Sequence, residues 1–182
     1  MFFRIFKIFL TYILINLCLI TFSYADLIKA IKITGNDRIP DETVIMFSQI
    51  NINDEINDSD LNRILKNLYE TDFFENISLN FSKNILEIKI TENPVIQNIT
   101  YEGIKSNKIK DLIVKNSQLK SRSSYNDLIL TKDIEQIKIA LKDLGYFFPS
   151  IETYLEDLKN NKINLTYKID LGEKAKIKKI SF

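Results

Sequence analysis

Histidine is absent from this 182-residue sequence, and cysteine occurs only once, at Cys18. Cys18 lies in an amino-terminal segment that we expect to be removed, so the remaining chain would contain neither residue. This composition excludes disulfide bonds, thiolate or imidazole metal sites, and catalysis by a Cys or His nucleophile. The sequence also contains no nucleotide-binding loop and no metal-ligand spacing.

The sequence has no large excess of charge of either sign. It contains 25 Lys and Arg against 24 Asp and Glu, and residues 1–25 hold two of the basic and none of the acidic residues, which leaves a net charge of −1 on the rest. A nucleic-acid-binding face requires concentrated Lys and Arg. We therefore expect no nucleic acid among the partners.

The first apolar run, at residues 8–22, is about fifteen residues long and so is short for a membrane span, which needs about twenty. Arg4 and Lys7 precede the run, and Ser23 and Ala25 provide the small residues that a signal peptidase recognises. We therefore expect residues 1–25 to be a cleaved secretory signal peptide. A retained single-pass anchor is the competing interpretation.

The rest of the chain contains a repeat. The pattern Ile-x-x-Ile-x-apolar-x-Gly occupies residues 28–35 and 96–103, and its first six positions return at 177–182. A fixed apolar pattern that returns along a chain is typical of a modular array. The expected parts are a first module at 26–93, a second at 94–172, and the first strand of a truncated third module at 173–182.

Each module shows the same order of predicted elements. In the first, alternating apolar residues predict strands around 31–33, 77–81 and 86–90. Pro40 with Asp41 and Glu42 predicts the start of a short helix. The segment Asn57-Asp58-Ser59-Asp60 is expected to cap a second helix. The apolar stripe of this second helix consists of Leu61, Ile64, Leu65 and Leu68.

The second module repeats this order. Strands are predicted around 99–101, 151–155 and 163–169. Ser106 is expected to cap the short helix, and a longer helix is predicted at 126–144, followed by Gly145 in the left-handed conformation. The order in both modules is β-α-α-β-β, which predicts an antiparallel pair of strands covered on one face by two helices.

The chain resembles the POTRA domains of the Omp85 family, and most of all its outer-membrane protein assembly factors. The likeness rests on the repeated pattern and on the segments 57–61, 68–77 and 89–96, which open the second helix, form its corner with the next strand, and join the modules. It covers the whole chain after residue 25. Asp72 departs from the family, which usually has Gly at this corner, but Asp tolerates the left-handed conformation better than most residues.

The resemblance implies an α+β fold of tandem POTRA-like modules, each a three-stranded mixed sheet covered by two helices. It implies a scaffold without enzymatic activity or a cofactor, on the periplasmic side of the outer membrane. The implied partners are unfolded outer-membrane protein clients, accessory assembly lipoproteins, and the outer membrane itself through a carboxy-terminal β-barrel outside this sequence. We therefore expect the chain to be the amino-terminal fragment of a longer protein.

A sheet edge exposes N–H and C=O groups to which an extended polypeptide can add a strand. The resemblance implies that the second strand of each module is this edge and that it docks clients. The candidate peptide-binding residues are Ile77, Ser78, Leu79, Asn80 and Phe81 in the first module and Ile151, Glu152, Thr153, Tyr154 and Leu155 in the second. The alternative is that these edges are solvated or covered by a neighbouring module.

Three other functions are open at this point. The chain could be the arm of another Omp85-type translocator, for two-partner secretion or autotransport, or a division protein of the FtsQ type, which would keep its anchor and carry one POTRA module. A secreted hydrolase could use the carboxylates of Asp41-Glu42 or Asp54-Glu55. Adjacent acids at helix starts and in loops are typically solvated, whereas catalytic pairs need a shaped, partly buried site.

Overall fold

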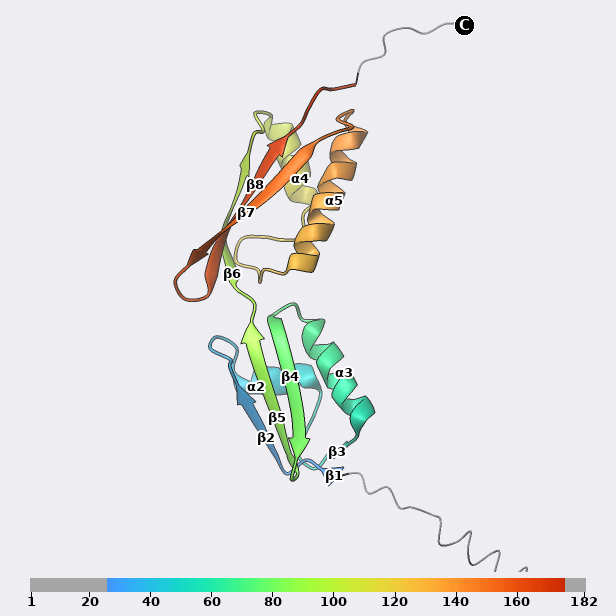
Figure 1. Cartoon of the computed structure of the whole chain (residues 1–182), viewed down its shortest axis with the longest axis vertical. Helices are drawn as coiled ribbons and strands as arrows, with labels where there is room; N and C mark the ends of the chain where they lie inside the picture. The colour runs from blue at the N-terminus through green and yellow to red at the C-terminus, as the bar shows by residue number, and fades with distance from the viewer. Residues whose placement is uncertain (1–25, 176–182) are drawn as a thin grey trace, which may run out of the picture.

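The computed structural model describes residues 26–175. The expected signal peptide, and residues 176–182 of the expected third-module strand, lie outside this range. Two three-stranded sheets follow one another along the chain, and each has two helices on one face (Figure 1). Within the described range, no helix combines the length and the apolar character needed to cross a membrane.

The first sheet has the strand order β2 (Ala30–Thr34), β5 (Ile85–Glu92), β4 (Phe74–Ser82). β2 runs parallel to β5, and β4 runs antiparallel to it. The chain passes between β2 and β4 through the helices α2 (Asp41–Ser48) and α3 (Asp58–Tyr69). This is the predicted mixed sheet in the predicted β-α-α-β-β order.

The core of this module lies between the sheet and the helices. Leu86 and Ile88 of β5 and Ile64 and Leu68 of α3 are fully buried at 0% exposure, and each such side chain contributes about 1.5–3 kcal/mol on leaving water. The other two residues of the predicted stripe, Leu61 and Leu65, are half-buried at its border. The stripe therefore faces the core as predicted, with its centre on Ile64 and Leu68.

The predicted cap of α3 is a complete capping box. Asn57 Oδ1 accepts hydrogen bonds from the backbone N–H groups of Ser59 (2.8 Å) and Asp60 (3.2 Å). Asp60 Oδ2 in turn accepts from the backbone N–H of Asn57 at 3.2 Å. Reciprocal bonding of this kind satisfies N–H groups that the first helical turn leaves unpaired.

A two-stranded antiparallel sheet at the start of the module was not predicted. It joins β1 (Asp26–Leu27) to β3 (Glu55–Ile56). Strands of two residues carry too short an alternation to be detected from sequence. Ile28 follows β1 directly and is 1% exposed, so this small sheet closes the end of the first core.

The second sheet has the strand order β6 (Val95–Glu102), β8 (Lys162–Asp170), β7 (Ser150–Leu158), with β6 parallel and β7 antiparallel to β8. Its helices are α4 (Asn107–Asn116) and α5 (Asp127–Asp143). The predicted order of elements is therefore confirmed in this module as well.

The two helices of the second module begin differently. Asn126 caps α5, because its Oδ1 accepts from the N–H groups of Leu128 (2.8 Å) and Ile129 (3.3 Å). Ser106 occupies the predicted N-cap position of α4, but its side chain makes no capping hydrogen bond. This end of α4 is exposed, and water can satisfy the N–H groups of its first turn.

Candidate interaction site

The second strand of each module lies at a sheet edge. Within the described residues, β4 pairs only with β5, and β7 pairs only with β8. The ten candidate residues therefore lie on edge strands, five on each. Peptide binding to these strands stays a prediction.

On β4, the side chains alternate between core and solvent. Ile77 is buried and Leu79 and Phe81 are half-buried against the first core, whereas Ser78 and Asn80 are exposed. The core-facing set anchors the strand to its module. A bound segment would therefore find small polar side chains on the outer face and backbone groups along the edge.

On β7, the alternation ends before the strand does. Ile151 and Thr153 are half-buried and Glu152 is exposed, but Tyr154 and Leu155 are both exposed, at 50% and 46%. Leu155 has the same parity as Ile151, so its exposure shows that the far half of β7 extends past the helical cover. β7 thus presents apolar surface next to a free edge.

The charged residues of β7 are all acidic. Glu152 accepts from the Tyr154 hydroxyl at 2.7 Å and lies 4.0 Å from Lys168 Nζ on β8, and Glu156 accepts from Asn164 Nδ2 at 2.8 Å. The hydrogen bond to Glu152 raises the pKa of Tyr154, so this hydroxyl keeps its proton to a higher pH than an ordinary tyrosine does.

The junction between the modules begins with a buried carboxylate. Glu92 Oε1 accepts from the backbone N–H groups of Arg38 (2.9 Å) and Ile39 (2.8 Å), and Oε2 lies 3.4 Å from Arg38 Nε. The Glu92 side chain is 4% exposed. A buried carboxylate is stable only with such partners, so Glu92 ties the end of β5 to the loop before α2.

Asn93 and Asp72 continue this bonding. The backbone N–H of Asn93 donates to Phe73 O (2.8 Å), and its Nδ2 donates to Asp72 O (2.9 Å). Asp72 has φ = 58°, so the corner adopts the left-handed conformation that Asp tolerates. Two hydrogen bonds then cross between the modules: Asn126 Nδ2 to Asp72 Oδ1 (3.0 Å) and Asn161 Nδ2 to Glu92 O (3.0 Å).

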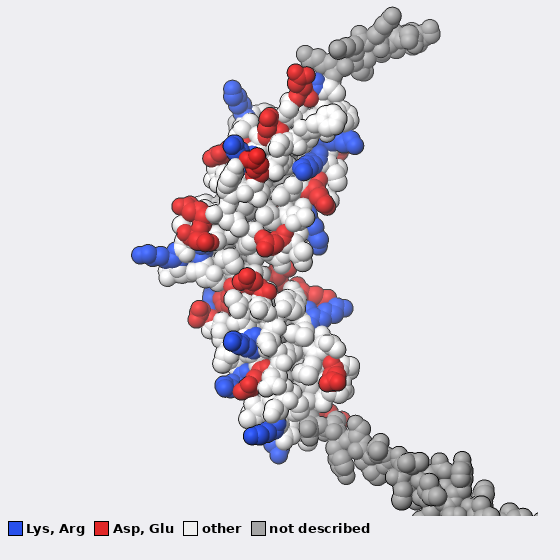
Figure 2. Space-filling model, in the orientation of Figure 1, with Lys and Arg blue, Asp and Glu red and all other residues white. Residues whose placement is uncertain are grey.

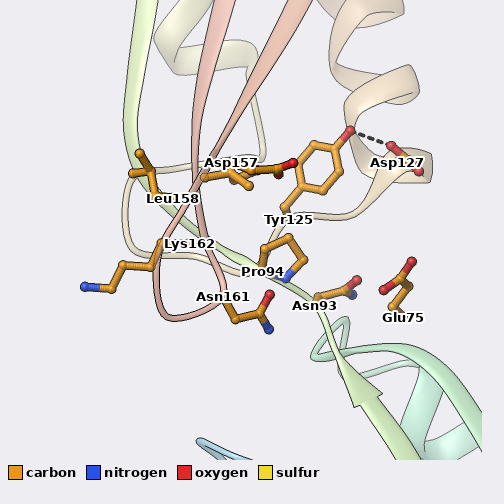
Figure 3. A pocket seen from close by; sticks show the side chains of 10 residues that line it. Glu75, Asn93, Pro94, Tyr125, Asp127, Asp157, Leu158, Asn161 and Lys162 are labelled. Atoms are coloured by element: carbon orange, nitrogen blue, oxygen red, sulfur yellow. Dashed lines mark hydrogen bonds between the residues drawn. The ribbon is translucent and has the colours of Figure 1, made fainter.

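A pocket of about 340 Å³ lies at this junction (Figure 3). Glu75 of β4 and Asp157 of β7 both line the pocket, so each edge strand contributes one residue to its wall. The Lys162 side chain points away from the centre of the pocket (Figure 3). The Tyr125 hydroxyl donates to Asp127, and burial together with this bond raises the pKa of Tyr125. The sequence did not predict this pocket, because its lining residues come from both modules. It is lined by Glu75, Asn93, Pro94, Tyr125, Asp127, Asp157, Leu158, Asn161, Lys162 and Ile163.

The carboxylates considered for hydrolysis have local partners. Asp41 Oδ1 accepts from Asn36 Nδ2 at 2.6 Å in the first turn of α2. Asp54 Oδ2 accepts from the backbone N–H of Asn51 at 2.7 Å. Asp41 therefore stabilises the start of α2, and Asp54 stabilises a turn. Among residues 26–175, His, Cys, Asp and Glu form no group of three or more that could hold a metal ion.

Charges of both signs are mixed over the surface. On the face shown in Figure 2, Lys and Arg lie between Asp and Glu along both modules. This face shows no basic stripe of the kind that follows a nucleic-acid backbone.

The POTRA family, described as surface antigen variable number repeat, matches the chain twice, at residues 27–93 and 94–172. Two similar curated proteins are outer membrane protein assembly factors BamA. The one from Neorickettsia risticii (strain Illinois) is 28% identical over 156 residues, and the one from Neisseria meningitidis serogroup B (strain ATCC BAA-335 / MC58) is 27% identical over 158. The alignments cover 84% and 85% of this chain but only 19% and 20% of these proteins.

The chain thus spans about a fifth of the length of these relatives. A solved structure, the N-terminal domain of Omp85 from the thermophilic cyanobacterium Thermosynechococcus elongatus, has the same fold. It has a TM-score of 0.53 and 14% identity, over 78% of this chain and 61% of that chain. The two family matches together cover most of the sequence. The chain belongs to the POTRA family, whose modules are scaffolds and not enzymes, and it contains two of these modules.

Proposed function

We propose that this chain is the periplasmic scaffold and client-docking arm of an outer-membrane β-barrel assembly machine. It binds unfolded clients by β-augmentation, in which a client segment pairs with the free edge of β4 or β7. The observation that carries the proposal is that the second strand of each POTRA module is an edge strand. The names of the curated relatives, outer membrane protein assembly factors, support the assembly role.

The dimensions of the edges suit such clients. β4 and β7 are nine residues each, and a strand of a membrane β-barrel has about 9–11 residues. Main-chain hydrogen bonds are largely independent of the client's side chains. One edge can therefore pair along most of one client strand, whatever its sequence.

Location and other partners follow from the same proposal. A cleaved signal peptide at residues 1–25 would deliver the chain to the periplasm. Attachment to the outer membrane through a carboxy-terminal barrel, and contact with accessory lipoproteins, would complete the assembly machine.

The relatives and the module count bear on the alternatives. The similarity to assembly factors favours the assembly machine over two-partner secretion or autotransport. An FtsQ-type division protein would have one POTRA module, whereas this chain has two.

The test is to block both edges and measure binding of an unfolded outer-membrane protein by the full chain. Leu79→Pro and Leu155→Pro each remove one backbone N–H. Both N–H groups point to the free edge, because N–H groups alternate in direction along a strand and those of Ile77 and Ile151, two and four residues earlier, point that way. Leu79→Ala combined with Leu155→Ala is the matched control, since it removes the same side chains and keeps the N–H groups.

We expect the proline pair to weaken binding by about 5-fold or more relative to the alanine pair, as each lost backbone bond is worth about 1 kcal/mol. Circular dichroism would establish that both variants stay folded. Equal affinities for the two folded variants would refute binding at the edges.

A further inference from the structure

We propose that the two edges differ: β7 accepts an added strand, whereas the hydroxyl of Tyr69 keeps the edge of β4 closed. The identity of the partner rests on the proposed function above. The closure of β4 does not, because it follows from contacts within the first module.

Tyr69 is the last residue of α3, and its hydroxyl accepts a hydrogen bond from the backbone N–H of Ile77 at 3.2 Å. This N–H points to the free edge. Ile77 pairs with Ile90, and the carbonyl oxygen of Ile90 faces Gly35 on the β2 side of the sheet. Because the N–H and C=O of one residue in an antiparallel pair point the same way, Ile77 and Ile90 form a pair without mutual hydrogen bonds. The Tyr69 hydroxyl thus occupies the position that a client carbonyl would take.

The second module has the same backbone arrangement. Ile151 pairs with Ile169, whose carbonyl oxygen faces Gly103 as that of Ile90 faces Gly35. Ile151 therefore directs its N–H to the free edge, and by alternation Thr153 and Leu155 do the same.

The second module has no counterpart of the Tyr69 hydroxyl. Lys142 takes its place, because Leu68 and Leu141 are both fully buried and each comes four residues before a residue with positive φ, Asp72 or Gly145. An ammonium group cannot accept a hydrogen bond. Among the hydrogen bonds within residues 26–175, none joins a side chain to the backbone of β7. The backbone groups of this edge are available.

The pairing of the two edge strands differs as well. The register of β4 with β5 shifts between Phe74 and Asn76, which marks a bulge, whereas β7 pairs with β8 without interruption from Ser150 to Leu158. Bulges and covering side chains are the devices that protect sheet edges from added strands. β4 has both devices, and β7 is long, regular and open.

The side chains of β7 specify the partner. Glu152, Tyr154 and Glu156 alternate on the outer face, and β7 contains no Lys or Arg. A side chain on an added strand lies about 5 Å from the residue opposite it. The partner that complements this edge is an extended polypeptide with a cation at two positions and an apolar or aromatic residue midway between them, in the order cation-x-apolar-x-cation.

The first experiment measures amide hydrogen exchange by NMR on the full chain without any client. We expect Ile77 to exchange slowly and Ile151, Thr153 and Leu155 to exchange fast. Tyr69→Phe removes only the hydroxyl and should speed exchange at Ile77 by about 5-fold or more, the value of one hydrogen bond. Slow exchange at all three β7 amides, or an unchanged rate at Ile77 in the variant, would overturn the inference.

The second experiment titrates a synthetic nine-residue peptide, Thr-Lys-Thr-Tyr-Thr-Lys-Thr-Val-Thr, and follows backbone amide shifts. We expect shifts along β7 in the natural chain and along both strands in Tyr69→Phe. Leu155→Pro should abolish the β7 shifts, with Leu155→Ala as its control. A peptide with Glu in place of both Lys should bind about 5-fold or more weakly, because like charges across paired strands repel.

The outcomes separate the two proposals. Equal shifts on β4 and β7 in the natural chain would refute the difference between the edges and leave the proposed function intact. Shifts on neither strand in any variant, for this peptide and for an unfolded outer-membrane protein, would refute the proposed function even if the exchange data confirm that Tyr69 closes β4.

Discussion

Gly35 and Gly103 hold the same place in the two modules, directly after the first strand of the pattern. Their φ angles are 90° and 83°, and a Cβ on either would lie 2.0 Å from a backbone carbonyl oxygen, that of Ile90 or Ile169. No L side chain fits that space. The first strand of each module lies close to the central strand at this point, and only glycine fits there. This explains why the repeated pattern at 28–35 and 96–103 ends in Gly.

Replacing Gly103 should therefore be severe. We expect Gly103→Ala to destabilise the second module by more than about 3 kcal/mol, from the left-handed backbone and the clash with Ile169 O. Gly172→Ala is the control: Gly172 also has a positive φ, but its Cβ would lie 3.3 Å from the nearest atom, so about 1–2 kcal/mol is expected. Urea denaturation measures both, and equal losses would mean that the close approach costs nothing.

Tyr167 gives the second module a pH dependence. It is fully buried, and its hydroxyl has no partner among the described residues. Burial, and then the charge of Asp133, raise the pKa of Tyr167. The unfolded tyrosine ionises near pH 10, about its ordinary pKa, whereas the folded one keeps its proton to higher pH. Its contribution to stability is complete below about pH 10 and is lost as pH rises further.

We expect the free energy of unfolding of the second module to fall above about pH 10, by up to about 1.4 kcal/mol per pH unit for this group. Tyr167→Phe should make that slope smaller. Urea denaturation between pH 8 and pH 11 measures the slope for both proteins. The same slope in both would show that Tyr167 ionises as freely in the folded as in the unfolded chain.

At the scale of elements, one buried carboxylate in each module holds a loop. Glu92 accepts from the N–H groups of Arg38 and Ile39, and Asp133 of α5 accepts from those of Gln118 (2.7 Å) and Leu119 (2.9 Å). In the first module this residue comes from the end of β5, and in the second it comes from a helix. In both modules a buried carboxylate accepts from two consecutive backbone N–H groups of a loop. The element that carries the carboxylate differs between the modules.

Removing the carboxylate of Asp133 should leave the backbone N–H groups of Gln118 and of the buried Leu119 without their acceptors. We expect Asp133→Ala to cost about 3 kcal/mol or more, and Asp133→Asn, which keeps one acceptor oxygen, to cost clearly less. Thermal and urea denaturation measure both variants. Equal losses would indicate that side-chain packing, and not these hydrogen bonds, accounts for the effect.

At the scale of the whole molecule, the junction combines a short connection with two side-chain hydrogen bonds. β5 ends at Glu92 and β6 begins at Val95, while Asp72 bonds to Asn126 and Asn161 bonds to Glu92 O. Asp72 stands at the corner where the second module has Gly145, and its side chain reaches the next module. These bonds join the two modules in addition to the covalent connection.

Asp72→Gly should remove the bond to Asn126 while keeping the positive φ. We expect the stability of the first module to change by less than about 1 kcal/mol and the orientations of the modules to become more variable. Residual dipolar couplings measured for each module report this variability. Asp72→Asn, which keeps an acceptor oxygen, should behave like the natural chain; loosening of both variants to the same degree would show that the charge, and not the acceptor, is needed.

The sequence alone determined the repeat, the order of the elements, the edge position of the second strands, the capping segment at residues 57–60 and the helix–strand corner near Asp72. These features depend on alternation, helical spacing and turn chemistry within a few neighbouring residues, or on a family likeness carried by such short segments. The tertiary structure alone decided which edge is closed, which carboxylates hold the loops, and where the modules meet. Tyr69 and Ile77 are eight residues apart, and Asp72 and Asn126 are 54 apart. Contacts at such separations depend on how helices pack on sheets and modules on each other, which no local pattern encodes.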